Sequence, residues 1–416
     1  MYGLMDCNNF FVSCERLFRP DLAKKPVAVL SSNDGCIVAR SQEVKDLGVP
    51  MGIPYFQVKE LCRTEGITLF SSNFTLYRDI SARVMTELRA IAESVEVYSV
   101  DEAFFRVPDS ATEGQLRAMR ERLVQAVGIP VSIGVAPTKT LAKHAAGIAK
   151  KERDGPGVHI LDMQAWPTDA KDVQASGIWG IGRQTSQALR AHGIETVAEL
   201  LAADRAFIRT LLGVGGVRIR EELSGTPVLA GNERDVQGSI VSSRSFRKAV
   251  TDLATLESAI GYHVSAIAEE LRREGWRATR LSVSIRPSLH GPRAGFGRSR
   301  DVLLAEPTAG THALLAEALG AVRAIFVPGT PYKKAGVAVG GIMPDASVTQ
   351  PLFVEDTAAR RAGALDGVID ALNARFGRGT VASAVVMGTE RWAASAERRS
   401  PAYTTDWDAL ATAKAA

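Results

Sequence analysis

The chain has 416 residues, 46% of them apolar and 23% charged, and its formal net charge is +4. That length exceeds one ordinary domain and predicts two to four, and no apolar run approaches membrane-spanning length. Asp6 stands where a signal peptide would carry basic residues, and all four cysteines fall within the first 62 residues without a Cys-x-x-Cys pair. We therefore expect neither a membrane span, nor a disulfide framework, nor a zinc knuckle, but reduced thiols in the cytoplasm.

The first predicted strand is a short apolar stretch, residues 2–5, that runs directly into an acid. This acid is Asp6, which is followed by Cys7, and the aromatic pair Phe10 and Phe11 opens the next segment. Mg²⁺ takes oxygen ligands from one or two carboxylates together with substrate phosphates. An acid at the end of a strand is therefore one half of what a two-metal phosphoryl-transfer site requires.

Residues 95–107 are rich in Val, Tyr and Phe, and they surround two adjacent acids, Asp101 and Glu102. Burying an ionised carboxylate without a partner is costly, so the pair either faces water at a hairpin tip or binds a metal. The stretch alone favours neither interpretation. Both carboxylates reach one metal only if the strand bends or ends there, because successive strand residues point to opposite faces. The presence of Asp6 elsewhere in the chain favours the metal site.

The elements around these acids predict an α+β fold. Strand, helix, acidic hairpin, helix and strand make a ferredoxin-like order, which suits an antiparallel sheet backed by helices. By default, lysines on such helices, including Lys45 and Lys150, are solvated. The predicted elements are strands at 26–30 and 131–135, a turn at 31–35, and helices at 41–48, 79–93 and 116–127.

The composition turns polar around residues 166–176, where we place a domain boundary. Gly180, Gly182 and Arg183 then lead into a helix. Gly-x-Gly between two helices fits a helix-hairpin-helix, whose backbone amides hold a DNA phosphate without reading the base sequence. Ordinary tight turns contain the same glycines. A second glycine-rich turn at 212–216 strengthens the nucleic-acid interpretation.

Residues 237–345 are the most basic part of the chain, with 14 Lys and Arg against 9 Asp and Glu. Eight arginines and one acid lie between residues 272 and 300, partly along a predicted strand that contains Arg280 and Arg286. A run of charges is usually a solvated face. Arginines nearly unopposed by acids instead suit contact with a phosphate backbone. Residues 331–339 predict an edge strand that closes this region.

Two motifs carry a resemblance to a known family. Asp6 with the following Asn-Asn-Phe-Phe at 8–11, and Tyr-Ser-Val-Asp-Glu at 98–102, resemble the two active-site signatures of Y-family translesion DNA polymerases. The resemblance continues through nearly the whole chain, and segments at 365–380 and 400–405 are similar to the C-terminal extension of the UmuC type, the catalytic subunit of bacterial DNA polymerase V. It implies a right-hand polymerase fold with a palm (1–12 and 79–168), small fingers (13–78), a helix-hairpin-helix thumb (169–236), an α/β little finger (237–345) and a C-terminal extension (346–416).

The resemblance also implies roles for individual residues. Asp6, Asp101 and Glu102 would hold two Mg²⁺ ions, with the backbone carbonyl of Cys7 as a further ligand. Phe11 stands at the aromatic steric gate against the 2′ position of the nucleotide. Lys45 stands where many relatives carry Arg, so its phosphate contact lacks the bidentate fork. The implied nucleotide-binding residues are Phe10, Phe11, Arg40, Lys45 and Lys150, and the DNA-binding residues are Gly180, Gly182, Arg183, Arg244, Arg280 and Arg286.

The implied activity is error-prone, DNA-directed DNA synthesis past damaged template in the SOS response. Its substrates would be primer-template DNA and deoxynucleoside triphosphates, and its partners a UmuD-like subunit and the RecA filament. Leu352 and Phe353 resemble the anchors of the peptide that docks bacterial polymerases on the sliding clamp. The glutamine that usually begins this peptide is replaced by Thr349, and Gln350 comes one position late.

Two other functions compete with a polymerase. A nucleotidyl cyclase uses a similar palm and two metal-binding carboxylates, but it does not need a glycine-rich thumb or an arginine-rich domain. A catalytically inactive, polymerase-like adaptor would keep the clamp peptide and lose the carboxylates. All three carboxylates are present, which counts against the adaptor.

Overall fold

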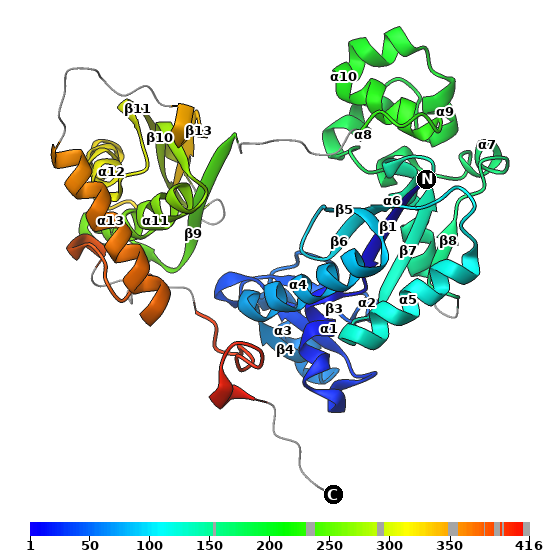
Figure 1. Ribbon diagram of the computed structural model, residues 1–416, viewed down its shortest axis with the longest axis horizontal. Coiled ribbons are helices and arrows are strands. Elements are labelled where there is room, and N and C mark those ends of the chain that lie inside the picture. Colours follow the sequence, from blue (N-terminus) through cyan, green and yellow to red (C-terminus); the bar gives the residue numbers. More distant parts are fainter. Residues whose placement is uncertain are drawn as a thin grey trace, which may run out of the picture. The chain divides into compact units, whose positions relative to one another are not determined.

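The computed structural model describes residues 1–152, 155–229, 238–288, 295–347, 357–377, 379–386, 392 and 395–410. The chain divides into two compact units, which are considered separately below (Figure 1). Unit 1 comprises Met1–Ser31, Gly35–Glu233 and Glu397–Ala416, and unit 2 comprises Ser32–Asp34 and Arg234–Ala396. Both combine helices with sheets, so the expected α+β class is confirmed. Among the described helices, none is long and apolar enough to cross a membrane.

Unit 1 contains a five-stranded sheet with the acid-bearing first strand at its centre. β1 pairs antiparallel with β6 on one side and with β7 on the other, and β8 runs parallel to β7. The acidic pair lies where the β5–β6 hairpin turns and β6 begins. Across the sheet the strands are β5 (Glu93–Val97), β6 (Glu102–Arg106), β1 (Tyr2–Cys7), β7 (Val131–Ala136) and β8 (Val158–Ile160).

Alternate residues of β1 face two different layers of helices. Met5 packs in one hydrophobic core with α4 and α5, whereas Leu4 packs in another with α6. This division follows from the two-residue period of a strand. The helices are α4 (Phe74–Ile91), α5 (Glu113–Val127) and α6 (Lys139–Lys151).

The backbone of α6 lies directly against β7. A Cβ atom on Gly134 would overlap the backbone nitrogen of Ala146 and lie 2.5 Å from the carbonyl oxygen of Ala142. Glycine in the strand and alanines on the helix therefore allow a contact that no larger residues permit. This close approach sets how far the lysines of α6 reach across the sheet.

A second, three-stranded sheet in unit 1 has the order β3-β2-β4. β2 is antiparallel to β3 and parallel to β4. Ala28 and Leu30 pack with α2 and α3, while Val27 and Val29 on the other face share the core of α1 and α4. These elements are β2 (Val27–Leu30), β3 (Ile37–Arg40), β4 (Thr68–Ser71), α1 (Phe10–Leu17), α2 (Gln42–Asp46) and α3 (Tyr55–Thr64).

Four further helices of unit 1 share a hydrophobic core with α6. Glu222, which is fully buried, ties them to the start of α6, because its carboxylate accepts hydrogen bonds from the backbone N–H of Thr140 at 3.0 Å and of Val228 at 2.8 Å. The helices are α7 (Trp166–Asp169), α8 (Arg183–Arg190), α9 (Val197–Ala202) and α10 (Arg205–Leu223).

Unit 2 has an antiparallel sheet of order β11-β10-β12-β9, packed against α11 and α12. The prediction of an edge strand at 331–339 is wrong, because β12 pairs with β10 on one side and β9 on the other. Ala335, Val337 and Val339 are buried there, which suits an internal strand. The elements are β9 (Ser239–Val250), β10 (Trp276–Pro287), β11 (Arg298–Thr308), β12 (Tyr332–Gly340), the short β13 (Met343–Pro344), α11 (Leu253–Arg273) and α12 (Thr311–Ile325).

The C-terminal extension contributes to both units. In unit 2, α13 (Thr357–Phe376) is held by an ion pair in which the Arg272 guanidinium lies 2.7 Å from the Asp370 carboxylate. Trp392 is only 2% exposed and belongs to the core of the same unit. Residues from 397 onward belong to unit 1.

Gly134→Ala tests the contact between α6 and the sheet. The added methyl group would collide with helix backbone, which cannot move as a side chain does, so we expect a loss of about 1–3 kcal/mol or more in urea unfolding. Gly147→Ala is the matched control, because it lies on α6 with no heavy atom within 4 Å of the added Cβ. That change should be neutral or stabilise by up to about 1 kcal/mol. Equal stability of the two variants would contradict the close packing.

Candidate active site

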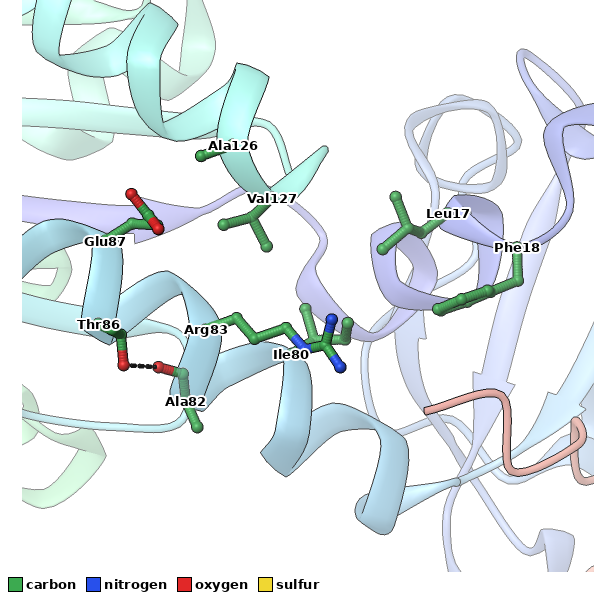
Figure 2. A pocket seen from close by; sticks show the side chains of 9 residues that line it. All are labelled: Leu17, Phe18, Ile80, Ala82, Arg83, Thr86, Glu87, Ala126 and Val127. Carbon is green, nitrogen blue, oxygen red and sulfur yellow. Dashed lines mark hydrogen bonds between the residues drawn. The ribbon is translucent and has the colours of Figure 1, made fainter. Parts of the chain in front are cut away.

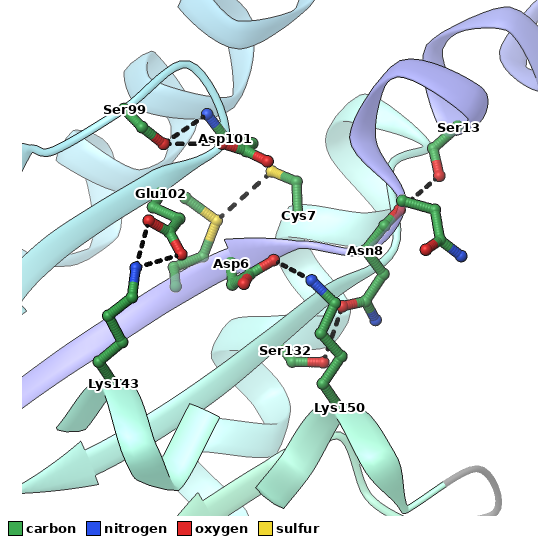
Figure 3. A network of polar contacts seen from close by, with 12 residues as sticks. Asp6, Cys7, Asn8, Ser13, Ser99, Asp101, Glu102, Ser132, Lys143 and Lys150 are labelled. Atoms are coloured by element: carbon green, nitrogen blue, oxygen red, sulfur yellow. Dashed lines mark hydrogen bonds and ion pairs between the residues drawn. The ribbon is translucent and has the colours of Figure 1, made fainter. Parts of the chain in front are cut away.

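The site is built where β1 ends and β6 begins. Asp6 lies directly opposite Glu102 in the antiparallel ladder, and directly opposed residues place their side chains on the same face. The backbone N–H of Cys7 donates to the carbonyl oxygen of Asp101 at 2.9 Å. Two segments separated by about 95 residues of chain thus place three carboxylates in one region (Figure 3).

Two lysines of α6 reach these carboxylates (Figure 3). The Lys143 ammonium lies 2.6 and 2.7 Å from the two carboxylate oxygens of Glu102, and that of Lys150 lies 2.6 Å from Oδ1 of Asp6. Seven residues make about two helical turns, so both lysines project from the same side of α6. The sequence analysis singled out Lys150 and missed Lys143, although the seven-residue spacing between them could have indicated it.

The third carboxylate is oriented by the hairpin turn itself. The hydroxyl of Ser99 donates to Oδ1 of Asp101 at 2.7 Å, and the backbone N–H of Asp101 lies 3.3 Å from the same hydroxyl oxygen. This local ring of hydrogen bonds restrains the Asp101 side chain. Ser99 was also missed in the sequence analysis, because its role depends on the turn geometry.

The carboxylates repel one another. Burial raises the pKa of Glu102, the negative charges of Asp6 and Asp101 raise it further, and Lys143 opposes the shift. Burial also raises the pKa of the Cys7 thiol, and the nearby carboxylates contribute to that shift. A cation at this position stabilises the charged carboxylates, because it offsets both desolvation and mutual repulsion.

The donor set suits a hard divalent cation. The carboxylates of Asp6, Asp101 and Glu102 and the carbonyl of Cys7 all offer oxygen, the element that Mg²⁺ prefers. In the part of the chain that the structure describes, however, no three His, Cys, Asp or Glu side chains converge closely enough to hold a metal ion. Lysine ammonium groups pair with Asp6 and Glu102 instead. The chemical types of these residues therefore suit a metal ion, and in this structure lysines supply the positive charge beside the carboxylates.

Cations from three elements gather near Asp6. The Lys45 ammonium on α2 donates to Oδ1 of Asn9 at 2.6 Å. Burial lowers the pKa of Lys45, and the positive charges of Lys150 and Arg40 lower it further. The Nε atom of Arg40 is buried without an acceptor among the described residues. Mutual repulsion and an unsatisfied donor together suit a polyanion such as a triphosphate.

The two phenylalanines that begin α1 lie in different environments. Phe11 stacks on Tyr77, with ring centroids 4.4 Å apart and an interplanar angle of 14°, and meets Phe74 edge-on at 5.8 Å. Phe11 is partly exposed, whereas Phe10 is 3% exposed and belongs to the hydrophobic core. The two rings differ because consecutive residues of a helix point in different directions. The nucleotide contact of Phe10 stays a prediction.

Gly180, Gly182 and Arg183 lie at the turn that begins α8. Gly180 has a φ of +90°, a region that favours glycine, and Gly182 is the N-cap residue of the helix. Arg183 follows as the first helical residue and is exposed. The unpaired backbone N–H groups of a helix start can bind an anion.

The predicted DNA-binding arginines of unit 2 divide between two faces of the sheet. Arg280 and Arg286 alternate along β10 with buried residues and therefore lie on the face away from the helices. The guanidinium of Arg244 instead lies 5.3 Å from the ring centre of Tyr262, on the side of α11, and the DNA contact of Arg244 stays a prediction. A groove of about 430 Å³ is lined by serines and cations that include Ser243, Ser282, Ser284, Arg286, Arg298 and Lys334.

Another groove, of about 550 Å³, lies in unit 1 between the end of α1, α4 and α5 (Figure 2). Apolar side chains such as Leu17, Phe18 and Val127 line it, and its charged residues are Arg83 and Glu87. None of the predicted catalytic residues lines this groove, so it is not the active site. The predicted clamp-binding residues Leu352 and Phe353 lie outside the described residues.

The chain is similar to known proteins along its whole length. The chain matches the impB/mucB/samB family at residues 5–147, the C-terminal domain of that family at 237–352, and a domain of unknown function (DUF4113) at 363–413. It is 37% identical to the protein UmuC of Salmonella typhimurium over 425 residues, which covers 100% of both chains. It is 29% identical to DNA polymerase IV of Bacillus velezensis over 68% of this chain and 69% of that protein.

The fold has a solved counterpart. A Y-family DNA polymerase chimera superposes with a TM-score of 0.68 at 18% sequence identity, covering 82% of this chain and 99% of the chimera. Similarity at that level of identity supports the fold, and the full-length match to UmuC supports the branch. These findings place the chain in the impB/mucB/samB family, among the Y-family DNA polymerases of the UmuC type.

Proposed function

We propose that the protein is an error-prone, DNA-directed DNA polymerase that extends primers past damaged template in the SOS response. The observation that carries this proposal is that Asp6, Asp101 and Glu102 lie at the adjacent ends of β1 and β6, beside cations from α2, β3 and α6. Carboxylates for metal ions next to cations for a triphosphate are the components that nucleotidyl transfer requires. A nucleotidyl cyclase would share the carboxylates, but the family match extends over the full chain.

Two Mg²⁺ ions would be held by Asp6, Asp101, Glu102 and the carbonyl of Cys7. When bound, such ions lower the pKa of the attacking 3′-hydroxyl and offset charge on the phosphates. Lys143 favours the charged form of Glu102, because its ammonium opposes the pKa rise that burial causes. The triphosphate would contact Arg40, Lys45 and Lys150. On binding, Lys150 would exchange its ion pair with Asp6 for one with a phosphate oxygen.

Sugar selection would depend on Phe11. This residue is partly exposed, and its ring stacks on Tyr77. Because phenylalanine has no hydroxyl, it can exclude a ribonucleotide only through its bulk. The position of the ring therefore matters more than its chemistry.

Template and primer would be held through their phosphates. Gly180, Gly182 and Arg183 offer backbone N–H groups and one cation at the start of α8, and Arg280 and Arg286 lie on the helix-free face of β10. Contacts of this kind position DNA without reading its sequence. Base pairing with the template would then select the nucleotide.

The domains and partners follow the same proposal. The palm would be 1–12 and 79–168, the fingers 13–78, the thumb 169–236, the little finger 237–345 and the extension 346–416. A UmuD-like subunit and the RecA filament would assist synthesis. The sliding clamp would bind Leu352 and Phe353.

The metal assignment is tested with Asp101→Ala and Glu102→Ala. Each variant loses an oxygen ligand, so primer extension with the UmuD-like subunit and RecA filament should fall at least about a hundredfold. Primer-template binding, followed by fluorescence anisotropy, should be nearly unchanged. The exposed acid on α5 provides a control, Glu121→Ala, which should extend primers normally. Extension at the wild-type rate by either active-site variant would contradict the assignment of these acids to two metal ions.

The gate is tested with Phe11→Ala. Removing the ring should raise incorporation of ribonucleotides relative to deoxyribonucleotides, because it opens space at the 2′ position. Single-nucleotide insertion kinetics with matched ribo- and deoxyribonucleoside triphosphates give the ratio directly. An unchanged ratio would assign Phe11 to packing alone, the commoner fate of a phenylalanine.

The clamp contact is tested with the double variant Leu352→Ala/Phe353→Ala. Peptide anchors usually carry most of the binding energy, at about 1–2 kcal/mol or more each. Extension on short primer-templates should stay normal, while stimulation by a clamp loaded on circular template should disappear. If the variant is stimulated as strongly as the wild type, the clamp docks elsewhere.

A further inference from the structure

The end of the C-terminal extension packs on the catalytic unit. The backbone N–H of Ser71, at the end of β4, donates to the carbonyl oxygen of Arg398 at 3.0 Å, and the N–H of Arg398 donates back to the Ser71 hydroxyl at 3.0 Å. Tyr403 stacks on Phe18 of the α1 C-terminus, with ring centroids 4.5 Å apart and an interplanar angle of 13°. Residues 398–403, here called the docked tail, are therefore held at both ends.

Asn73 makes the central contact of the docked tail. Its side-chain N–H₂ group lies 3.0 Å from the hydroxyl oxygen of Ser400, 3.2 Å from the Ser400 carbonyl and 3.3 Å from the Pro401 carbonyl. Its side-chain oxygen accepts from the N–H of Leu76 and so caps α4. Asn73 and Ser400 are 4% and 7% exposed, so these polar groups depend on each other for hydrogen bonds.

A buried carboxylate of α1, Glu15, is 0% exposed. The hydroxyl of Tyr77 donates to Glu15 at 2.6 Å. Burial raises the pKa of Glu15, and the hydrogen bond from Tyr77 opposes that rise. The other carboxylate oxygen of Glu15 is buried without a hydrogen-bond partner among the described residues, so this carboxylate depends on the Tyr77 hydroxyl.

Tyr77 contacts α1 at two points. Its ring stacks on Phe11, and its hydroxyl binds Glu15, one helical turn further along α1. Tyr77 is itself fully buried, so the position of its ring depends on the hydroxyl contact as well as on packing. The docked tail is connected to this ring through Asn73 at the start of α4, which binds Ser400 and whose carbonyl oxygen accepts the backbone N–H of Tyr77 at 3.0 Å. Tyr77 in turn stacks on Phe11.

We propose that the docked tail positions the sugar-selecting ring of Phe11, with Ser400, Asn73 and Tyr77 as positioning residues. This inference rests on the gate function proposed for Phe11. A ring that discriminates by bulk alone must be held in place by its neighbours, because it has no hydroxyl of its own to anchor it. The segment matched by the domain of unknown function thereby contributes to nucleotide selection. It acts from behind α1 and does not touch the nucleotide.

Ser400→Ala and Tyr77→Phe, in the full chain, test the proposal by single-nucleotide insertion. Each change removes one hydroxyl and keeps the rest of the side chain, so the Phe11 ring should be held less firmly. We expect the preference for deoxyribonucleotides to fall roughly three- to tenfold, mainly through a lower KM for the ribonucleotide. The kcat for deoxyribonucleotides should change little. Thr405→Ala, an exposed residue just beyond the docked tail, is the matched control and should leave the preference unchanged.

Combination with Phe11→Ala separates this inference from the gate itself. If the docked tail acts through Phe11, then Ser400→Ala and Tyr77→Phe will have no further effect on the preference once the Phe11 ring is absent. Additive effects would overturn the proposal, as would wild-type preference in both single variants while Phe11→Ala loses it. An unchanged preference in Phe11→Ala would instead refute the proposed gate. Hydrogen exchange at Ser71 reports whether the tail stays docked in each variant.

Discussion

Carboxylates that face one another on neighbouring strands repel, and the catalytic unit is arranged around that constraint. Asp6 and Glu102 are directly opposed on β1 and β6, and Asp101 joins them through the backbone bond to Cys7. Burying such charges away from water adds a desolvation free energy to this repulsion. The site is therefore stable only with positive charge nearby, whether that charge comes from lysine or from a metal ion.

The position of α6 supplies that charge. Its backbone rests on Gly134 of β7, which brings two lysines on one helical face to the ends of β1 and β6. The same helix is joined at its start to the following helical segment through Glu222. A glycine in a strand thus has a functional consequence, because the helix could not approach so closely over any larger residue.

Glu15 meets the same physical problem with a different solution. The hydroxyl group of Tyr77, rather than a cation, donates a hydrogen bond to this buried carboxylate. Hydroxyl donors are directional, so they fix positions where an ammonium mainly supplies charge. The carboxylates of Asp6, Asp101 and Glu102 prepare a site for chemistry, whereas Glu15 fixes the side chain of Tyr77, which stacks on Phe11.

The sequence by itself determined the fold class, the family and the three acids. Strand-forming residues around an unpartnered acidic pair could be recognised without coordinates, because hydrophobic period and charge are local properties. The interior position of β12 could not, since an edge strand and a central strand differ in their neighbours more than in their own residues.

Only the tertiary structure decided which polar groups meet. Lys143 and Glu102 are 41 residues apart, and Asn73 and Ser400 are 327 apart. No local pattern connects such pairs, because each residue lies on a helix, strand or loop whose own sequence is compatible with many packing arrangements. Their contacts exist because β1 is central, α6 touches the sheet, and the chain returns at residue 398 to the end of β4. Local sequence patterns therefore identify the proposed catalytic acids, whereas long-range packing determines which groups orient them and balance their charge.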